Sequence, residues 1–564
     1  MGIAVAAGLV TFVYRLALVR DLTNDHYMHL AWAQQVLFGQ IPGRDFVDPG
    51  MPLMYLLSAA VQWIAPGPFY EALLTCVLLA VAAAATLIVT VELTGSLAIG
   101  ITATACEVAL EPRLYSYPKI LVPAVVLLLI QHYARRPSRG HVVWLAAWTA
   151  VAVLLRHDLG VYAAAGVGAG LIVVHLHERG PLMRALLEYA VALIVLMLPY
   201  VAFVQWSEGL FEHLHAAVEF AKNEAHQRFL APPGFPFWSN SAGLASWDKS
   251  DAAIFLFYAA YLLAVVCLVL LVKRPASLAR GGFRGDASDA QRRSTAAAGL
   301  AMLMLYLVVV LRHPIESRLP DIGAVFAIMC GWALAESARR GMVTSAATAT
   351  LVAASLVNVS ILVGVADRVK DTGIASGPAS VERSIASVKE AGTVWPWQRF
   401  WPAGEMPAAV RYLNACTTRD DAVLLTWAAP EYYFFAQRKF GAGHALFLPP
   451  DAFTTKHDQD RMLAQIGRER IPIVLINETR REEFARAYPE VDGYIAEHYT
   501  AAGQFDIRDG SRITVAVNRS FRRRGGYAPE GWPCGFERRA ASSTASTMLD
   551  GSAIPLPAMS NAVP

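Results

Sequence analysis

Charged and histidine side chains gather in four short segments that separate long apolar stretches of the chain. Each segment carries a cation together with a carboxylate or a histidine. Arginine and lysine bind phosphate groups, and a carboxylate or a histidine takes a proton from a hydroxyl. The combination indicates a site that holds a phosphate-bearing substrate and activates a hydroxyl group. The candidate phosphate-binding residues are Arg44, Arg113, Lys119, Arg156 and Arg318.

Each of these cations also has a simpler explanation. A lone Arg or Lys at a helix end serves as an interfacial anchor, and Arg156 can form an ion pair with Asp158. The first segment offers Asp25 and Asp45 as oxygen ligands for a divalent cation, which prefers such ligands. Asp45 can equally pair with Arg44, so a metal remains open and no other cofactor is indicated.

The apolar stretches that must position these residues predict a polytopic α-helical membrane protein. Of the 564 residues 55% are hydrophobic and 16% are charged, against about 25% charged in a soluble domain. A spanning helix needs about 20 mostly apolar residues. By that rule we expect about eleven spans, with 51–65 as an interfacial helix. The expected spans are 3–19, 70–92, 96–110, 119–133, 141–156, 159–176, 184–205, 251–272, 295–312, 321–337 and 342–365.

Lysine and arginine in the short loops predict the orientation. One set of loops holds about 13 basic residues in roughly 50 positions, and the opposite set holds about 10 in roughly 100. Since basic loops stay in the cytoplasm, we expect a bacterial-type inner or plasma membrane protein with a cytoplasmic N-terminus. The first loop, 20–52, and a long loop, 206–250, then lie outside the cell. Net charge is only +3, and the sequence has no basic run interleaved with aromatics. We therefore expect no nucleic-acid partner.

The C-terminal part differs in character from the membrane region 1–365. After a linker at 366–406, residues 407–520 alternate between helical and strand patterns, which predicts a small extracytoplasmic α/β domain. Residues 521–564 are expected to form a disordered tail, which is rich in Ala, Ser and Pro after about Arg539. Cys416 and Cys534 can pair if this part is exported.

The first segment resembles that of a known family. Asp25-His26-Tyr27 follows the first span, an amphipathic stretch ends at Gly39, and Pro52-Leu53 enters an interfacial helix. This organisation is similar to the GT-C superfamily of membrane glycosyltransferases, in particular the protein O-mannosyltransferase and lipid A aminoarabinose transferase branch. Arg318-Leu-Pro-Asp321 resembles the family's late loop.

The resemblance implies transfer of a sugar from a polyprenyl-phosphate donor to a glycan, lipid or protein acceptor on the outer face. Asp25 matches the family's catalytic carboxylate, which acts as general base with inversion at the anomeric carbon. The family's second acidic residue is replaced by His26. Because its charge changes near neutral pH, His26 is a candidate to share the proton transfer.

Two alternatives belong to other functional classes. A transporter or flippase needs charges at mid-membrane or broken helices in matched halves, whereas the charges here fall at helix ends. A non-catalytic envelope assembly protein would use the α/β domain to bind a partner.

Overall fold

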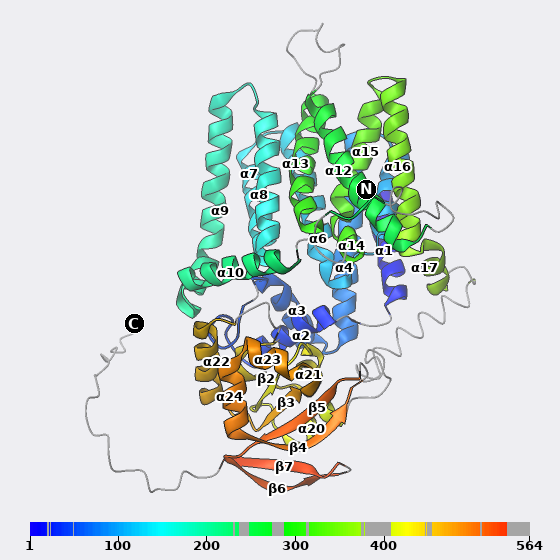
Figure 1. Ribbon diagram of the computed structural model, residues 1–564. Helices are drawn as coiled ribbons and strands as arrows, with labels where there is room; N and C mark the ends of the chain where they lie inside the picture. Colours follow the sequence, from blue (N-terminus) through cyan, green and yellow to red (C-terminus); the bar gives the residue numbers. More distant parts are fainter. Residues whose placement is uncertain are drawn as a thin grey trace.

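The computed structural model places a layer of long helices above a small α/β domain, with short helices between them (Figure 1). The connections between helices that carry the candidate residues lie at the end of the helical layer that faces the domain. The structure describes residues 1–19, 22, 24–48, 50–228, 232–235, 247–272, 287–311, 315–373, 377, 408–445, 447, 454–507, 510–528 and 530–538.

The long helices coincide with the apolar stretches of the sequence. Their limits differ from the expected ones by a few residues, except that α13 begins eight residues earlier than expected. They are α1 (Gly2–Leu18), α4 (Pro68–Thr94), α5 (Leu97–Ala109), α6 (Tyr117–Arg135), α7 (Arg139–Leu155), α8 (His157–Val174), α9 (Arg179–Ser207), α12 (Lys249–Val272), α13 (Ala287–Val310), α15 (Gly323–Ala338) and α16 (Met342–Val363).

Seven helical segments in the described residues are long and apolar enough to cross a membrane. The coarse prediction of a helical membrane protein therefore stands, while the count of eleven spans stays a prediction. Four further apolar helices, among them α1, α5 and α7, are shorter. The outer surface of the layer is apolar where it would face lipid: α9 exposes Leu187, Val191 and Ile194.

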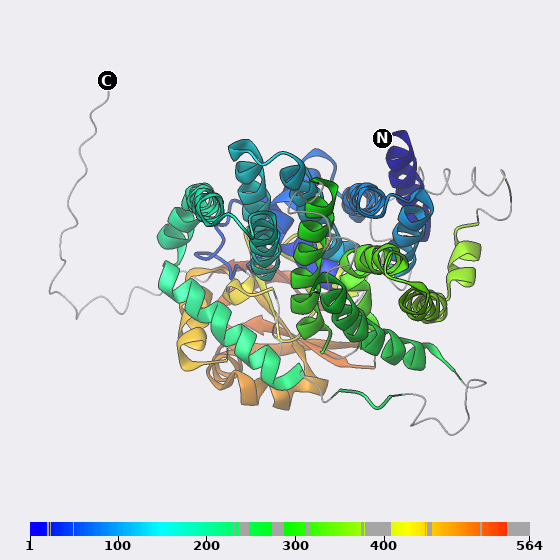
Figure 2. The same ribbon diagram turned by 90° about the horizontal axis from the view of Figure 1, so that it is seen from above.

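The expected loops at the domain-facing end are largely helical. The first loop contains α2 (Asn24–Leu37) and is followed by α3 (Pro52–Ile64), which matches the interfacial helix predicted at 51–65. The prediction of a long loop at 206–250 is corrected over its first half, because α10 (Leu210–Arg228) runs across the end of the helical layer (Figure 1 and Figure 2). The shorter elements at this end are η1 (Leu114–Ser116), α14 (Ile315–Arg318), η3 (Leu319–Ile322) and α17 (Val365–Asp371).

The C-terminal domain is the α/β unit that the alternating pattern predicts. A five-stranded sheet has the order β2-β1-β3-β5-β4, in which β1 pairs in parallel with β2 and β3, and β5 is antiparallel to both of its neighbours. Its elements are α20 (Ala408–Cys416), β1 (Ala422–Leu425), α21 (Pro430–Ala436), β2 (Lys439–Phe440), α22 (Lys456–Arg468), β3 (Ile473–Asn477), α23 (Arg481–Ala487), α24 (Pro489–His498), β4 (Tyr499–Asp506) and β5 (Arg512–Asn518).

The predicted end of this domain at residue 520 is wrong. Residues expected in the tail form an antiparallel hairpin of β6 (Phe521–Tyr527) and β7 (Trp532–Arg538). Trp532 packs against Tyr412 of α20, and Cys416 forms a disulfide bond with Cys534. The hairpin therefore belongs to the folded domain. Most of the predicted linker and the tail from 539 onward lie outside the described residues.

The domain and the first loop share one hydrophobic core. Tyr27 of α2 packs against Phe435 with ring centroids 5.4 Å apart, and Phe46 packs against Phe440 at 6.1 Å. The backbone N–H of Val47 donates to the carbonyl of Gly443 at 3.0 Å. These contacts join segments that lie about 400 residues apart in sequence. The first loop is thus the surface on which the domain sits.

Candidate functional site

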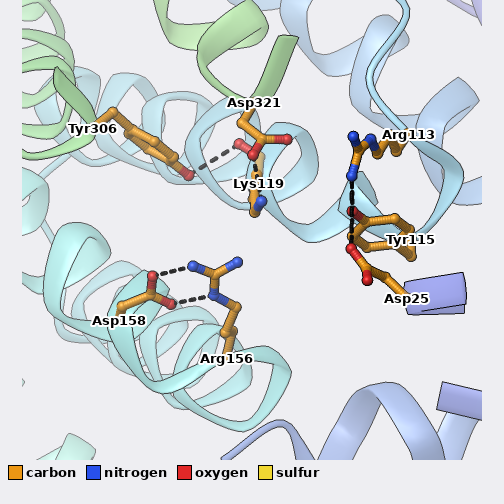
Figure 3. Close-up of polar contacts among 8 residues, drawn as sticks. All are labelled: Asp25, Arg113, Tyr115, Lys119, Arg156, Asp158, Tyr306 and Asp321. Atoms are coloured by element: carbon orange, nitrogen blue, oxygen red, sulfur yellow. Dashed lines mark hydrogen bonds and ion pairs between the residues drawn. The ribbon is translucent and has the colours of Figure 1, made fainter. Parts of the chain in front are cut away.

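Breaks between helices place the candidate cations at one end of the helical layer. Arg156 separates α7 from α8 in an extended conformation, with φ −170° and ψ 128°. Lys119 lies in the first turn of α6, directly after Pro118, which favours a helix start. Arg318 ends α14, and Asp321 lies in the following short helix η3. Each break turns a polar side chain toward the space between α6, α8 and α13 (Figure 3).

Two ion pairs occupy this space. The Lys119 ammonium donates to Asp321 across 202 residues of sequence, and both side chains are more than nine-tenths buried. Arg156 donates from Nε and Nη2 to the two carboxylate oxygens of Asp158 at 2.6 and 2.5 Å. The Tyr306 hydroxyl donates to the backbone carbonyl of Lys119 at 3.0 Å. The structure thus confirms the pairing of Arg156 with Asp158 that the sequence offered.

These residues line a cavity that carries excess positive charge. Lys119, Arg156 and Arg318 contribute three cations, while Asp158 and Asp321 contribute two carboxylates, which leaves one positive charge over. The Nε of Arg318 is buried and has no hydrogen-bond partner among the described residues. The cavity holds about 10 Å³, the space of about one water molecule. A phosphate group is larger than this space, so binding one would require the ion pairs to open.

A second group, Asp25, Tyr115 and Arg113, lies beside the cavity and is called the open group, because the Asp25 and Arg113 side chains are nearly half-exposed. The Tyr115 hydroxyl donates to Oδ2 of Asp25 at 2.6 Å and accepts from Nη1 of Arg113 at 2.7 Å. Arg113 Nη1 is also 3.6 Å from the Asp25 oxygen. Figure 3 shows the three side chains in a row, with the Asp25 carboxylate at one end. A carboxylate held in this way keeps one oxygen for an external hydroxyl.

Contacts from two other helices hold the segment that carries Arg113 and Tyr115. The buried Arg15 of α1 donates to the carbonyl of Pro112, and Arg368 of α17 pairs with Glu111 at 3.0 Å. Glu111 has a φ of +52°, a conformation that non-glycine residues adopt rarely. The segment is therefore fixed by its surroundings rather than by its own preference.

The two groups lie close to each other. Tyr115 precedes Lys119 by four residues, so their Cα atoms are at most about 14 Å apart. His29 of α2 lies between the groups: its ring packs 6.0 Å from that of Tyr115, and its buried Nδ1 has no partner in the described part of the chain. Burial, with the nearby charges of His26, Arg156 and Lys119, lowers the pKa of His29 to about 3.

His26 belongs to the protein interior, and its ring centroid lies 6.3 Å from that of Tyr115. It is 1% exposed, and its Nε2 lies 3.1 Å from Oε1 of Glu71. The same carboxylate oxygen accepts from the Ser58 hydroxyl at 2.8 Å. This buried network joins α2, α3 and α4, so the structure gives His26 a role in positioning Asp25's helix. Its predicted share in proton transfer finds no contact with Asp25 in support.

Arg44 is also placed apart from the other candidate cations. It donates to both oxygens of Asp45 at 2.9 Å and lies 6.0 Å from the ring of Trp206 at the end of α9. Asp45 in turn accepts from the N–H of Ile41 at 2.8 Å. Asp45 therefore closes a local turn, and the described residues contain no cluster of three or more His, Cys, Asp or Glu side chains that could hold a metal ion.

Sequence reasoning missed residues that complete the site. Tyr115 and Tyr306 were not singled out, although Tyr115 lies in a segment that also holds two of the candidate cations. The pairing of Asp321 with Lys119 and of Glu71 with His26 links distant helices, and no spacing in the chain indicates it.

Comparison with known proteins adds no relative. No family model matches the sequence, and no curated protein matches it. The resemblance to membrane glycosyltransferases therefore rests on the chain's own residues.

Proposed function

We propose that this protein is a membrane glycosyltransferase that moves a sugar from a polyprenyl-phosphate donor to an acceptor hydroxyl. The observation that carries the proposal is the cavity with one excess positive charge beside a half-exposed carboxylate. Transfer from a lipid phosphate needs cations at the leaving group and a base at the acceptor. Lys119, Arg156 and Arg318 would supply the first, and Asp25 would supply the second.

The proposed reaction is a single displacement. The acceptor oxygen attacks the anomeric carbon of the sugar, and its proton passes to Asp25. The bond between the anomeric carbon and the phosphate oxygen breaks, and the phosphate leaves with both bonding electrons. Positive charge in the cavity stabilises this leaving group. Attack from the side opposite the phosphate inverts the anomeric configuration.

The proposal includes an orientation. We propose eleven spans, a cytoplasmic N-terminus and an extracytoplasmic C-terminal domain. The distribution of basic residues between the loops supports this orientation. The bond between Cys416 and Cys534 supports it independently, because disulfides persist in oxidising compartments. The domain and the site would then share the outer face.

The C-terminal domain would bring the acceptor to the site or cover it. Its core continues into α2, the helix that begins at the residue before Asp25. A docked domain therefore sets the position of this carboxylate. The alternative functions, a transporter or an envelope assembly protein, have no observation in their favour that outweighs this arrangement.

The test is transfer by the purified protein in lipid vesicles. Polyprenyl-phosphate carriers charged with different sugars are added with a membrane extract as acceptor source, and release of polyprenyl phosphate is measured by mass spectrometry. Replacing Asp25 by Asn should lower the rate by about 100-fold to 10,000-fold, the usual contribution of a general base. Folding should be unaffected, since the Asp25 side chain is 47% exposed.

The matched control is Asp367→Asn. Asp367 is an exposed carboxylate on α17 that pairs only with Lys370 among the described residues that surround it, so its loss should leave transfer unchanged. Full activity of Asp25→Asn would refute the assignment of the base. Uptake of a solute into the vesicles without release of polyprenyl phosphate would favour a transporter instead.

A further inference from the structure

A second, larger cavity lies inside the helical layer, apart from the charged site. It has a volume of about 290 Å³ and lies between α5, α15 and α16. None of its lining residues lines the charged cavity. Ligand pockets range from roughly 300 to 1,000 Å³, so this cavity has the size of a small ligand pocket.

The shape of the cavity suits a chain. Its lining runs from Ala98 to Cys106 on α5 and from Phe326 to Leu334 on α15. Each stretch has nine residues, and the eight steps between them cover about 12 Å along the helix axis. A volume of 290 Å³ over about 12 Å corresponds to a cross-section of roughly 24 Å². One extended hydrocarbon chain fits this cross-section.

The chemistry of the lining favours apolar ligands. Thr102 and Ser355 carry its hydroxyl groups, and that of Ser355 already donates to the carbonyl of Leu351 within its own helix; the rest is Ala, Leu, Ile, Val, Phe, Cys and Gly. Water needs two to four polar partners to remain in a cavity, and this lining offers too few. A dry cavity of this size would leave its lining without contacts on one side. An apolar occupant restores them.

The cavity continues into the surface that faces lipid. Ala349 and Ala353 of α16 line it and are themselves exposed, and Ile101 of α5 is 50% exposed beside it. All three lie on helices with apolar outer faces. We infer that this cavity binds one acyl chain of a bilayer phospholipid, which enters between α5 and α16 and fills the space that their small side chains leave. This inference is independent of the proposed glycosyl transfer.

The chain's own cysteines provide a direct test. Cys106 and Cys330 line the cavity with free thiols, whereas Cys76 and Cys267 are free, fully buried and outside it. The full-length protein is stripped of lipid in detergent and treated with a small apolar maleimide, with and without added phosphatidylglycerol. We expect the phospholipid to slow labelling of Cys106 and Cys330 by at least tenfold. Cys76 and Cys267 should stay unreactive in both conditions. Equal labelling of the cavity thiols with and without phospholipid would overturn the inference.

Variants that fill the cavity from its open side supply the second readout. Ala353→Phe places a ring in the opening, and Ala347→Phe places the same ring on an exposed position of α16 that does not line the cavity. In native mass spectrometry the wild type and Ala347→Phe should retain one phospholipid, and Ala353→Phe should retain none. Retention by Ala353→Phe would contradict the inference. Displacement of the phospholipid by polyprenyl phosphate at lower concentration would also overturn it, since the site would then belong to the carrier.

Discussion

Two groups of charged residues meet at one end of the helices, and they differ in burial. Lys119 and Asp321 are more than nine-tenths buried and neutralise each other, with the Arg156–Asp158 pair beside them. Asp25 and Arg113 are nearly half-exposed and are bridged by Tyr115. Both groups would have been described from the sequence alone as charges at helix ends.

The difference in burial predicts how strongly mutations in each group affect folding. Burying an ion pair costs several kcal/mol per ion in desolvation, on the order of 5 kcal/mol. Removing one partner of a buried pair therefore leaves an unpaired buried charge and strongly destabilises the protein. A half-exposed pair contributes about 0–1 kcal/mol. Mutations in the buried group should therefore affect folding together with the proposed phosphate binding. The open group can be changed with little effect on folding, so it reports on chemistry alone.

The largest effect is expected at Lys119. Replacement by Met leaves the Asp321 carboxylate buried and unpaired, and we expect the free energy of unfolding to fall by about 3–5 kcal/mol. The measurement is thermal unfolding of the detergent-solubilised protein. The double variant Lys119→Met with Asp321→Leu should recover most of the stability, because no charge stays unpaired, and should still lack transfer.

The matched control for this variant is Arg113→Met, which breaks the half-exposed pair. We expect it to destabilise the protein by less than about 1 kcal/mol. Equal destabilisation by Lys119→Met and Arg113→Met would remove the distinction between the buried and the open group.

A smaller effect is expected from the protonation of His29, which lies between the two groups. Because its pKa in the folded protein is about 3, the unfolded chain takes up a proton near pH 6.5 and the folded chain does not. Stability from this residue is therefore complete above pH 6.5 and is lost as the pH falls toward 3. Between pH 6.5 and pH 5 we expect a loss of roughly 1–2 kcal/mol.

His29→Gln removes this pH dependence while keeping a polar side chain. The difference between the unfolding curves of wild type and variant should shrink from pH 7 to pH 5. A constant difference over this range would show that His29 has the same pKa in the folded and the unfolded state, which would place it in the open group.

The helices of this protein could be predicted well from sequence because apolar runs dictate them locally. Lys119 and Arg156 were predicted as candidate cations because helix breaks with charges are visible in the chain, and the structure places both in the lining of one cavity. The partners of these residues could not be predicted. Asp321 reaches Lys119, and Glu71 reaches His26, only after helices far apart in the chain have packed.

The same reason explains the errors in the C-terminal part. The sequence around Arg522, Arg523 and Arg524 is polar and predicts a tail. It forms strand β6 only because it pairs with β7. The docking of α2 on the domain likewise joins residues about 400 positions apart, such as Gln35 and Arg438. Periodicity within a segment contains no information on such contacts.

A moderate effect is expected from Tyr115→Phe, which removes one hydroxyl from the open group. Asp25 then loses the hydrogen bond of 2.6 Å and Arg113 loses its acceptor. We expect the proposed transfer to slow about tenfold, the equivalent of about 1.4 kcal/mol. The fall should appear in kcat with KM unchanged, because the hydroxyl holds the base rather than the donor. A rise in KM alone would assign Tyr115 to donor binding instead.

The smallest effect is expected at Arg44, the sequence-predicted cation that joins neither group. Its guanidinium is exposed and is already engaged by Asp45 and the Trp206 ring. If phosphate binding belongs to the buried cavity, Arg44→Gln should change the rate of transfer by less than about twofold and leave the unfolding temperature unchanged. The measurement is transfer at donor concentrations below KM, where a lost phosphate contact would be visible.

The matched comparison is Arg318→Gln, measured in the same way. It should lower transfer at least tenfold, because Arg318 lines the cavity and its Nε has no partner in the described residues. A loss at Arg44 equal to that at Arg318 would move the phosphate site to the first loop and α9, and the buried ion pairs would then be structural only.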